Sequence, residues 1–167
     1  YSDFLKFQFA AFSEEVFVGV GNIVPIHWKS EFNRLPPRGL DWALAKAVGD
    51  YKMGLSPNLL VGVQILINPD LRNRGLSYEF IEAMKRLART YGIEHIALPV
   101  RPTLKHEYPL VPMEEYMGWI NQKGEPFDPW IRVHMKTGGE MISVCPESMT
   151  IQEIISLKKL LAQYSLI

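Results

Sequence analysis

The middle of the chain constrains the fold most, because its apolar residues follow a strand pattern, then a helical pattern and then a strand pattern again. Residues 59–67 form a near-continuous apolar run, typical of a strand covered on both faces, and residues 68–70 (Asn-Pro-Asp) end it. Apolar side chains of residues 78–91 then fall on one helical stripe, and Gly92 stands where a C-terminal glycine cap belongs. Residues 93–100 form a second apolar run. This strand–helix–strand unit predicts two parallel strands in a covered sheet of an α/β domain.

The segments upstream predict a hairpin and a helix. Residues 15–18 and 22–25 have the composition of short strands, and we expect Gly19 and Gly21 to mark the turn between them. Residues 42–51 are predicted to be helical. The expected N-cap and inner stripe of this helix are Asp41 and then Leu44, Ala45, Val48 and Tyr51.

The downstream third predicts two helices and a strand. Asp128 is a good N-cap for a helix over 129–136, which Pro129 begins and residues 138–139 (Gly-Gly) end. Residues 141–145 have a strand pattern, and we interpret Cys145 within it as a structural residue. Residues 150–153 (Thr-Ile-Gln-Glu) form a capping box, which predicts a C-terminal helix over 150–164.

The loop over residues 72–77 joins the central strand to its helix and has the features of an anion site. First-turn N–H groups of a helix have no intrahelical acceptor, and the helix dipole adds positive potential there. Gly75 removes a Cβ where a phosphate must approach, and Arg72 and Arg74 supply cations. The alternative is a solvated polar turn that only begins the helix. Local pattern alone leaves the two interpretations open.

Composition and motifs exclude several other classes. Lys plus Arg and Asp plus Glu both number 18, so electrostatics give no reason to expect nucleic acid or an anionic membrane as the main partner. The nucleotide-binding motif GxxxxGK[ST] is absent, and Gly19 and Gly21 lack both a third glycine and a following helix, which excludes a dinucleotide-binding fingerprint. A single cysteine, no apolar run of about 18 residues and no signal-peptide pattern favour a cytoplasmic protein.

The motif Arg72-x-x-Gly75-x-Ser77 resembles the Q/R-x-x-G-x-G/A signature of the GNAT (N-acetyltransferase) superfamily, with Ser77 as a departure at the last position. The order of predicted elements over about residues 14–146 is similar to the GNAT core. The resemblance implies one domain over 1–167, whose central mixed sheet is flanked by helices and splayed between its fourth and fifth strands, which are residues 59–67 and 94–100 here. An insert over 101–127 and the helix over 150–164 are departures from the usual family pattern.

The resemblance also implies an acyl-CoA site in the splayed gap. Main-chain groups of the fourth strand would pair with the pantetheine arm, and amides of the loop would bind the pyrophosphate. The implied cofactor-binding residues are Ile65, Ile67, Arg72, Asn73, Arg74, Gly75, Leu76 and Ser77. Acetyl-CoA or another acyl-CoA is the expected co-substrate. No metal is expected, since the His and Glu residues have no recognisable ligand spacing.

The insert and the helix after it look like one GNAT subgroup, which includes the GNAT-like loading and decarboxylase domains of polyketide synthases. That resemblance places Thr103 and His134 where a catalytic Thr and His act, and it makes Trp28 a match for an aromatic pocket wall. Tyr108 and Trp130 are further candidates for the substrate pocket. The structural alternatives are a turn cap for Thr103, a surface position for His134 and ordinary core packing for the aromatic residues.

Three functions follow from the resemblance. The first is an acyltransferase that moves an acetyl or acyl group from CoA to an amine or thiol. The second is a decarboxylase of malonyl-type acyl-CoA that loads a carrier protein, and the third is a non-catalytic acyl-CoA-binding module. The expected partner is a small-molecule or carrier-protein acceptor, with no nucleic acid and no membrane, and a homodimer is left open.

Overall fold

The computed structural model describes residues 2–31 and 34–148, so the predicted C-terminal helix over 150–164 lies outside the described residues. One four-stranded sheet has the order β1-β2-β3-β4, antiparallel between its first three strands and parallel between β3 and β4. The strands are β1 Gln8–Ser13, β2 Val16–Ile26, β3 Leu59–Ile67 and β4 His95–Ala97. The helices are α1 Gly39–Lys52, α2 Leu76–Thr90, α3 Met113–Tyr116 and α4 Pro129–Lys136, with 3-10 turns η1 Ser2–Phe7, η3 Pro69–Leu71 and η4 Lys105–Glu107.

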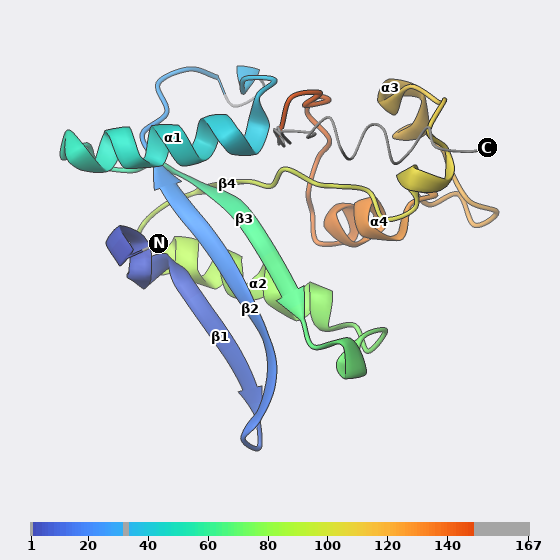
Figure 1. The fold of residues 1–167 in the computed structure, drawn as a ribbon, viewed down its shortest axis with the longest axis horizontal. Coiled ribbons are helices and arrows are strands. Elements are labelled where there is room, and N and C mark those ends of the chain that lie inside the picture. Colours follow the sequence, from blue (N-terminus) through green and yellow to red (C-terminus); the bar gives the residue numbers. More distant parts are fainter. Residues whose placement is uncertain (1, 32–33, 149–167) are drawn as a thin grey trace, which may run out of the picture.

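The central β3–α2–β4 unit confirms the predicted parallel pair and the mixed α/β fold. Figure 1 shows α2 behind the sheet and α1 across the end where β2 stops and β3 begins. Helix α2 begins two residues before the predicted start, and Gly92 follows its end in a left-handed conformation (φ +65°). Only residues 95–97 of the predicted strand over 93–100 pair with β3. The main core fills the space between the sheet and the two long helices.

The predicted hairpin with its turn at Gly19 and Gly21 is wrong, because both glycines lie inside the single strand β2. The turn is instead at Glu14 and Glu15, both with positive φ, and β1 precedes it. A Cβ on Gly19 would lie 2.3 Å from the carbonyl oxygen of Leu66 on β3, so the two strands approach too closely for a side chain. These glycines serve packing within the sheet, a use that a turn signal does not reveal.

Helix α1 confirms the predicted element but not its cap or its inner face. It begins at Gly39, and Asp41 lies in its first turn rather than at the N-cap, which is Arg38. Its buried side chains are displaced from the predicted stripe, since Val48 and Tyr51 are 40% and 55% exposed. The buried residues are Gly39, Leu40, Ala43, Ala47 and Asp50.

The reason for the displaced stripe is a buried carboxylate. Asp50 accepts hydrogen bonds from the main-chain N–H of His27 at 2.7 Å and from the Lys46 Nζ at 3.0 Å. These bonds satisfy a charged group on the inner face of α1. A pattern based on apolar residues assigns that face incorrectly.

Downstream of β4, the predicted helix over 129–136 is confirmed as α4 with Asp128 as its N-cap. The predicted strand over 141–145 is wrong, since the structure has no strand there. This segment leads instead to the start of α1, where the Ser148 hydroxyl accepts a hydrogen bond from the Leu40 N–H at 3.1 Å. Its backbone groups therefore do not join the sheet.

The insert over 101–127 packs around its own aromatic cluster. The rings have centroid separations of 4.9 to 6.1 Å, mostly in edge-to-face or tilted arrangements. Such pairs stabilise a small core beyond the area that they bury. The cluster consists of Tyr108, Tyr116, Trp119 and Phe127.

Candidate acyl-CoA site

The sheet opens where β3 and β4 part. The two strands pair only through Leu59–His95, Leu60–Ile96 and Val61–Ala97, and Figure 1 shows the chain then leaving the sheet toward α4. A Cβ on Gly62 would lie 2.3 Å from the Leu98 side chain, which packs against β3 just past the last pair. The two strands diverge beyond that point, as a sheet splayed between them requires.

The second half of β3 directs main-chain groups into this opening. The Asn68 N–H donates to the carbonyl of Val18 on β2 at 2.8 Å. Because successive residues of a strand point their N–H and C=O groups to opposite sides, those of Ile67 and Ile65 point away from β2. They face the side from which β4 has departed, and among residues 2–31 and 34–148 no strand pairs with them there.

The loop after β3 is shaped by two residues with a left-handed backbone conformation, Asn73 and Gly75. Asn68 ties it to β2 through a bond from its Nδ2 to the Phe17 carbonyl at 3.0 Å, and Asn73 has φ +62°. Gly75 is the N-cap of α2 at φ +77°, with no side-chain cap. No atom lies within 4 Å of the position that a Cβ on Gly75 would take. A phosphate can therefore approach the start of α2 closely.

The chemistry of this loop fits a pyrophosphate. The main-chain N–H groups of Leu76 and Ser77 lie in the first turn of α2, where a helix offers them no acceptor. Arg72 and Arg74 are exposed beside them and add positive charge to that of the helix N-terminus. Of the six predicted loop residues, the first four are exposed, and Leu76 and Ser77 are half-buried at the start of α2.

His134 lies on α4 and lines a half-open cavity of about 760 Å³ with Met84, Lys85 and Leu98 among its other walls. Burial lowers the pKa of His134 from 6.5 to about 4, so the imidazole is neutral at physiological pH. Its ring packs edge-to-face against Trp130 at a centroid distance of 4.6 Å. Within the described residues the ring nitrogens have no hydrogen-bond partner, which leaves them free to meet a ligand.

The lowered pKa predicts how stability changes with pH. Unfolded His134 takes up its proton near pH 6.5 and folded His134 only near pH 4. The unfolded state therefore binds more protons in this window, so the contribution is complete above pH 6.5 and is lost as pH falls toward 4. We expect the wild type to lose about 3 kcal/mol more than His134→Gln between pH 7 and pH 4. Urea unfolding of both proteins at several pH values measures the difference, and parallel curves would contradict it.

Thr103 is exposed and lines a different cavity, of about 470 Å³, together with Arg101, Lys105 and His106. Its main-chain carbonyl accepts a hydrogen bond from the Nδ1 of His106 at 2.9 Å, which makes it part of a local turn. The structure therefore does not bring Thr103 and His134 into one cavity.

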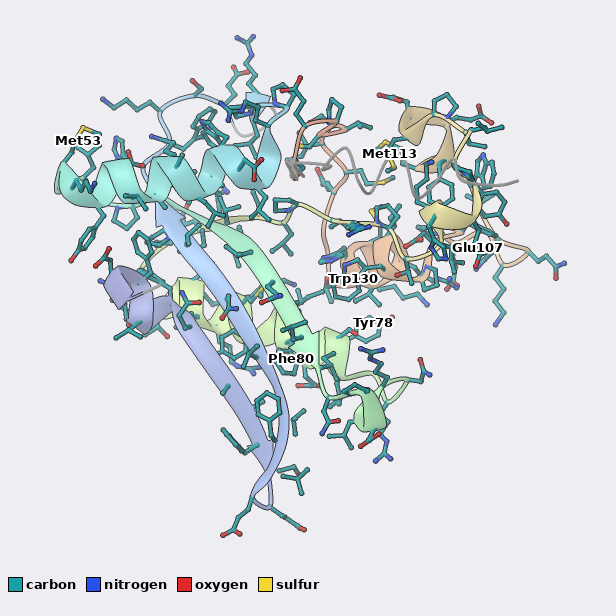
Figure 2. The ribbon with its side chains drawn as sticks, in the orientation of Figure 1. Met53, Tyr78, Phe80, Glu107, Met113 and Trp130 are labelled. Atoms are coloured by element: carbon teal, nitrogen blue, oxygen red, sulfur yellow. The ribbon has the colours of Figure 1, made fainter. Side chains whose placement is uncertain are left out.

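The three aromatic residues predicted for the substrate pocket lie apart. Trp28 packs edge-to-face against Trp42 of α1 at 5.2 Å, and Tyr108 belongs to the aromatic cluster of the insert. Trp130 has a ring contact with another predicted site residue, namely His134. Figure 2 shows Trp130 on α4 on the side of the neighbouring α2, which carries Tyr78 near its start.

Lys85 is a residue of this region that the sequence did not identify. Its Nζ lies 2.7 Å from a Glu82 carboxylate oxygen and also donates to the Thr137 carbonyl after the last turn of α4. It thereby fixes α4 against α2 next to the His134 cavity. Lys85 is a charged residue outside the apolar stripe of its helix, and no local signal marks Thr137 as its partner.

Within residues 2–31 and 34–148, no group of three or more His, Cys, Asp or Glu side chains could hold a metal ion. No helix in that part of the chain is long and apolar enough to cross a membrane.

The chain is similar to several known proteins, although no protein-family model matches it. Over 145 residues it is 35% identical to the arginine N-acetyltransferase avaD of Aspergillus versicolor, a match that covers 82% of this chain and 49% of the relative. The chain thus spans about half the length of that curated relative.

Two solved structures have the same fold. The loading GNATL domain of CurA from Lyngbya majuscula superposes with a TM-score of 0.58 at 21% identity, over 80% of this chain and 63% of the other. The GphF GNAT-like decarboxylase in complex with isobutyryl-CoA gives 0.56 at 19% identity, over 84% and 73%. With its β3–α2–β4 unit, its splayed sheet edge and its likeness to these two structures, the chain has the GNAT fold.

Proposed function

We propose that this chain carries an acyl-CoA-dependent acyltransferase activity that moves an acetyl or acyl group from CoA to an amine or thiol acceptor. The observation that carries the proposal is the uncapped start of α2 at Gly75, set beside the open edge of β3. The main-chain groups of Ile65 and Ile67 would bind the pantetheine arm. Residues 72–77 would bind the pyrophosphate. We also propose a cytoplasmic setting, where acyl-CoA is made and used.

The geometry suits this co-substrate for a physical reason. An anion bound at the first turn of α2 extends naturally along β3, since the strand and the helix meet at that loop. The pantetheine amides would then lie beside main-chain groups that have no strand partner on that side in the described part of the chain. Both parts of the carrier would be recognised largely by main-chain atoms.

The reaction joins the acceptor to the thioester carbonyl carbon and breaks the carbon–sulfur bond. The electron pair of that bond leaves with sulfur, and the proton that the acceptor nitrogen or sulfur loses balances the one that the CoA sulfur takes up to give the free thiol. Neutral His134 is a weak base with a pKa of about 4, so it is better suited to donate its N–H to the carbonyl oxygen than to remove a proton from an ammonium group.

The acceptor we propose to test first is free arginine, because the curated relative is an arginine N-acetyltransferase. Acceptor pockets are built from loops, and the insert over 101–127 has no counterpart in the usual family pattern. Because the insert changes the loops that would surround an acceptor, a carrier-protein thiol is the second acceptor to test.

A decarboxylating reaction is the second candidate, favoured by the same neutral imidazole. When a malonyl-type group loses carbon dioxide, the carbon–carbon bond breaks and its electron pair moves toward the thioester oxygen. An N–H donor such as His134 stabilises charge there, and a proton from water completes the product. The acyl group would then pass to a carrier thiol.

One assay separates the candidates. The protein is incubated with acetyl-CoA or malonyl-CoA, with and without arginine or a carrier thiol, while mass and free CoA thiol are followed. We expect acetyl transfer to an acceptor that falls about 100-fold in His134→Gln, as loss of a donor to the developing charge predicts. Loss of carbon dioxide from malonyl-CoA that depends on His134 supports the decarboxylase. Tight CoA binding without either reaction indicates a binding module and contradicts the enzyme proposal.

A further inference from the structure

Asp128 does more in this structure than cap a helix. Its side chain is 1% exposed, and both of its oxygens are fully used. Oδ1 accepts from the N–H groups of Trp130 at 2.9 Å and Ile131 at 3.2 Å, as an N-cap does. Oδ2 accepts from the N–H of Leu104 at 2.8 Å and from the hydroxyl of Tyr116 at 3.0 Å. The second pair of bonds ties α4 to the insert.

The carboxylate stays ionised despite its burial. Burial raises the pKa of Asp128, but hydrogen bonds from the main chain of Leu104, Ile131 and Thr103 and from the Tyr116 hydroxyl outweigh that effect and leave the pKa below its ordinary value. Hydrogen bonds to an ionised acceptor are stronger than those between neutral groups. The charge therefore holds the two segments firmly.

The segments that meet at Asp128 carry the two predicted catalytic residues. Leu104 directly follows Thr103, so the bond to its N–H fixes the main chain at Thr103. On the other side, Trp130 is held by its N–H, and its ring contacts the ring of His134 at 4.6 Å. Figure 2 shows both segments: Trp130 lies on α4, and Glu107 and Met113 lie on the insert.

We propose that Asp128 is a positioning residue of the acyl-transfer site. It holds the start of the insert at Thr103 and the helix that carries His134 in one relative arrangement, although these side chains line separate cavities. The inference rests on the proposed function for its catalytic part. Its structural part concerns only the contacts of this carboxylate.

The variant Asp128→Asn separates the two roles of the side chain. Its Oδ1 still caps α4, because Asn is as good an N-cap as Asp. Its Nδ2 is a donor and cannot accept from the N–H of Leu104, so that bond is lost, whereas the Tyr116 hydroxyl can turn to accept from Nδ2. We expect amide hydrogen exchange, followed by NMR, to become at least tenfold faster at Leu104. Exchange at Ile131 should stay slow.

For catalysis, we expect Asp128→Asn to lower turnover without weakening CoA binding. Without the link, the Thr103 segment and the His134 ring lose their fixed geometry, and misplacements of about 1 Å cost up to 100-fold in rate. We expect kcat of Asp128→Asn to fall at least tenfold while the Kd for CoA stays within about twofold. Because the CoA loop lies on other elements, a merely destabilised fold would not produce this split.

Asp50→Asn is the matched control. Asp50 is also a buried carboxylate that accepts from a main-chain N–H, that of His27, but it lies on α1. We expect this variant to be destabilised like Asp128→Asn while keeping the wild-type kcat. An equal loss of kcat in both variants would overturn the positioning role and point to stability alone.

The remaining outcomes test the structural and the catalytic part of the proposal separately. Fast Leu104 exchange with unchanged kcat overturns the catalytic part and leaves the proposed function intact. Unchanged Leu104 exchange overturns the link itself. A wild-type protein that binds CoA but transfers no acyl group contradicts the proposed function and, with it, the catalytic part, while Leu104 exchange still decides the structural part.

Discussion

Replacing Gly75 with valine should weaken CoA binding at least tenfold. Gly75 has φ +77°, a conformation that costs a residue with a Cβ about 1–2 kcal/mol and a β-branched one more. The first turn of α2 would relax away from its present position, and the new isopropyl group would occupy the open approach to the N–H groups. Isothermal titration with CoA measures the change.

The control for this variant is Gly54→Val. Gly54 has φ +66° and likewise no atom within 4 Å of its Cβ position, but it follows the end of α1. Both variants should lose similar stability, and only Gly75→Val should lose CoA affinity. Gly75→Asn, whose side chain tolerates the left-handed region, should retain the fold best. Equal CoA affinity in folded Gly75→Val and wild type would remove the pyrophosphate site from this loop.

Gly19→Ala should lower the free energy of unfolding by about 3 kcal/mol. The new Cβ would lie 2.3 Å from the Leu66 carbonyl oxygen and 2.9 Å from the Phe80 ring. Backbone cannot yield there without moving β3 against β2, because these strands form the longest pairing of the sheet. Urea unfolding monitored by circular dichroism provides the value.

Gly49→Ala is the corresponding control within α1. No atom lies within 4 Å of the Cβ position on Gly49, and alanine is favoured over glycine in a helix by about 0.5–1 kcal/mol. This variant should be more stable than the wild type. A stable Gly19→Ala protein would show that the close approach of β2 and β3 is not needed.

Gly19 also illustrates which parts of the fold could be predicted. The unit from Leu59 to Ala97 was correct because a long apolar run and a strong helical stripe repeat one signal many times. Gly19 was assigned incorrectly because glycine marks both turns and close packing, and the neighbouring strand that decides between them is 40 or more residues away. The inner face of α1 was assigned incorrectly for a similar reason. Asp50 is buried on that face because His27 and Lys46 donate hydrogen bonds to its carboxylate, and a pattern of apolar residues does not include a charged one.

The same distinction applies to the site. The loop from Arg72 to Ser77 is local, so its sequence sufficed to predict a turn between a strand and a helix that begins beside Gly75, and its anion-binding role stays a prediction. The relation of Thr103 to His134 depends on the path of the insert, which is fixed by nonlocal contacts such as the one between Leu104 and Asp128. Sequence identified Asp128 as an N-cap because that role is local, and it missed the bond to a residue 24 positions away.

The opening beside Ile65 and Ile67 has an evolutionary consequence. A ligand held by peptide groups places little demand on the side chains that those groups carry, so selection on this strand acts on shape and burial rather than on residue type. Descendants can then exchange most of their residues and still hold the same carrier. Under the proposed function, this freedom is consistent with an architecture that recurs in proteins sharing 19% and 21% of its residues.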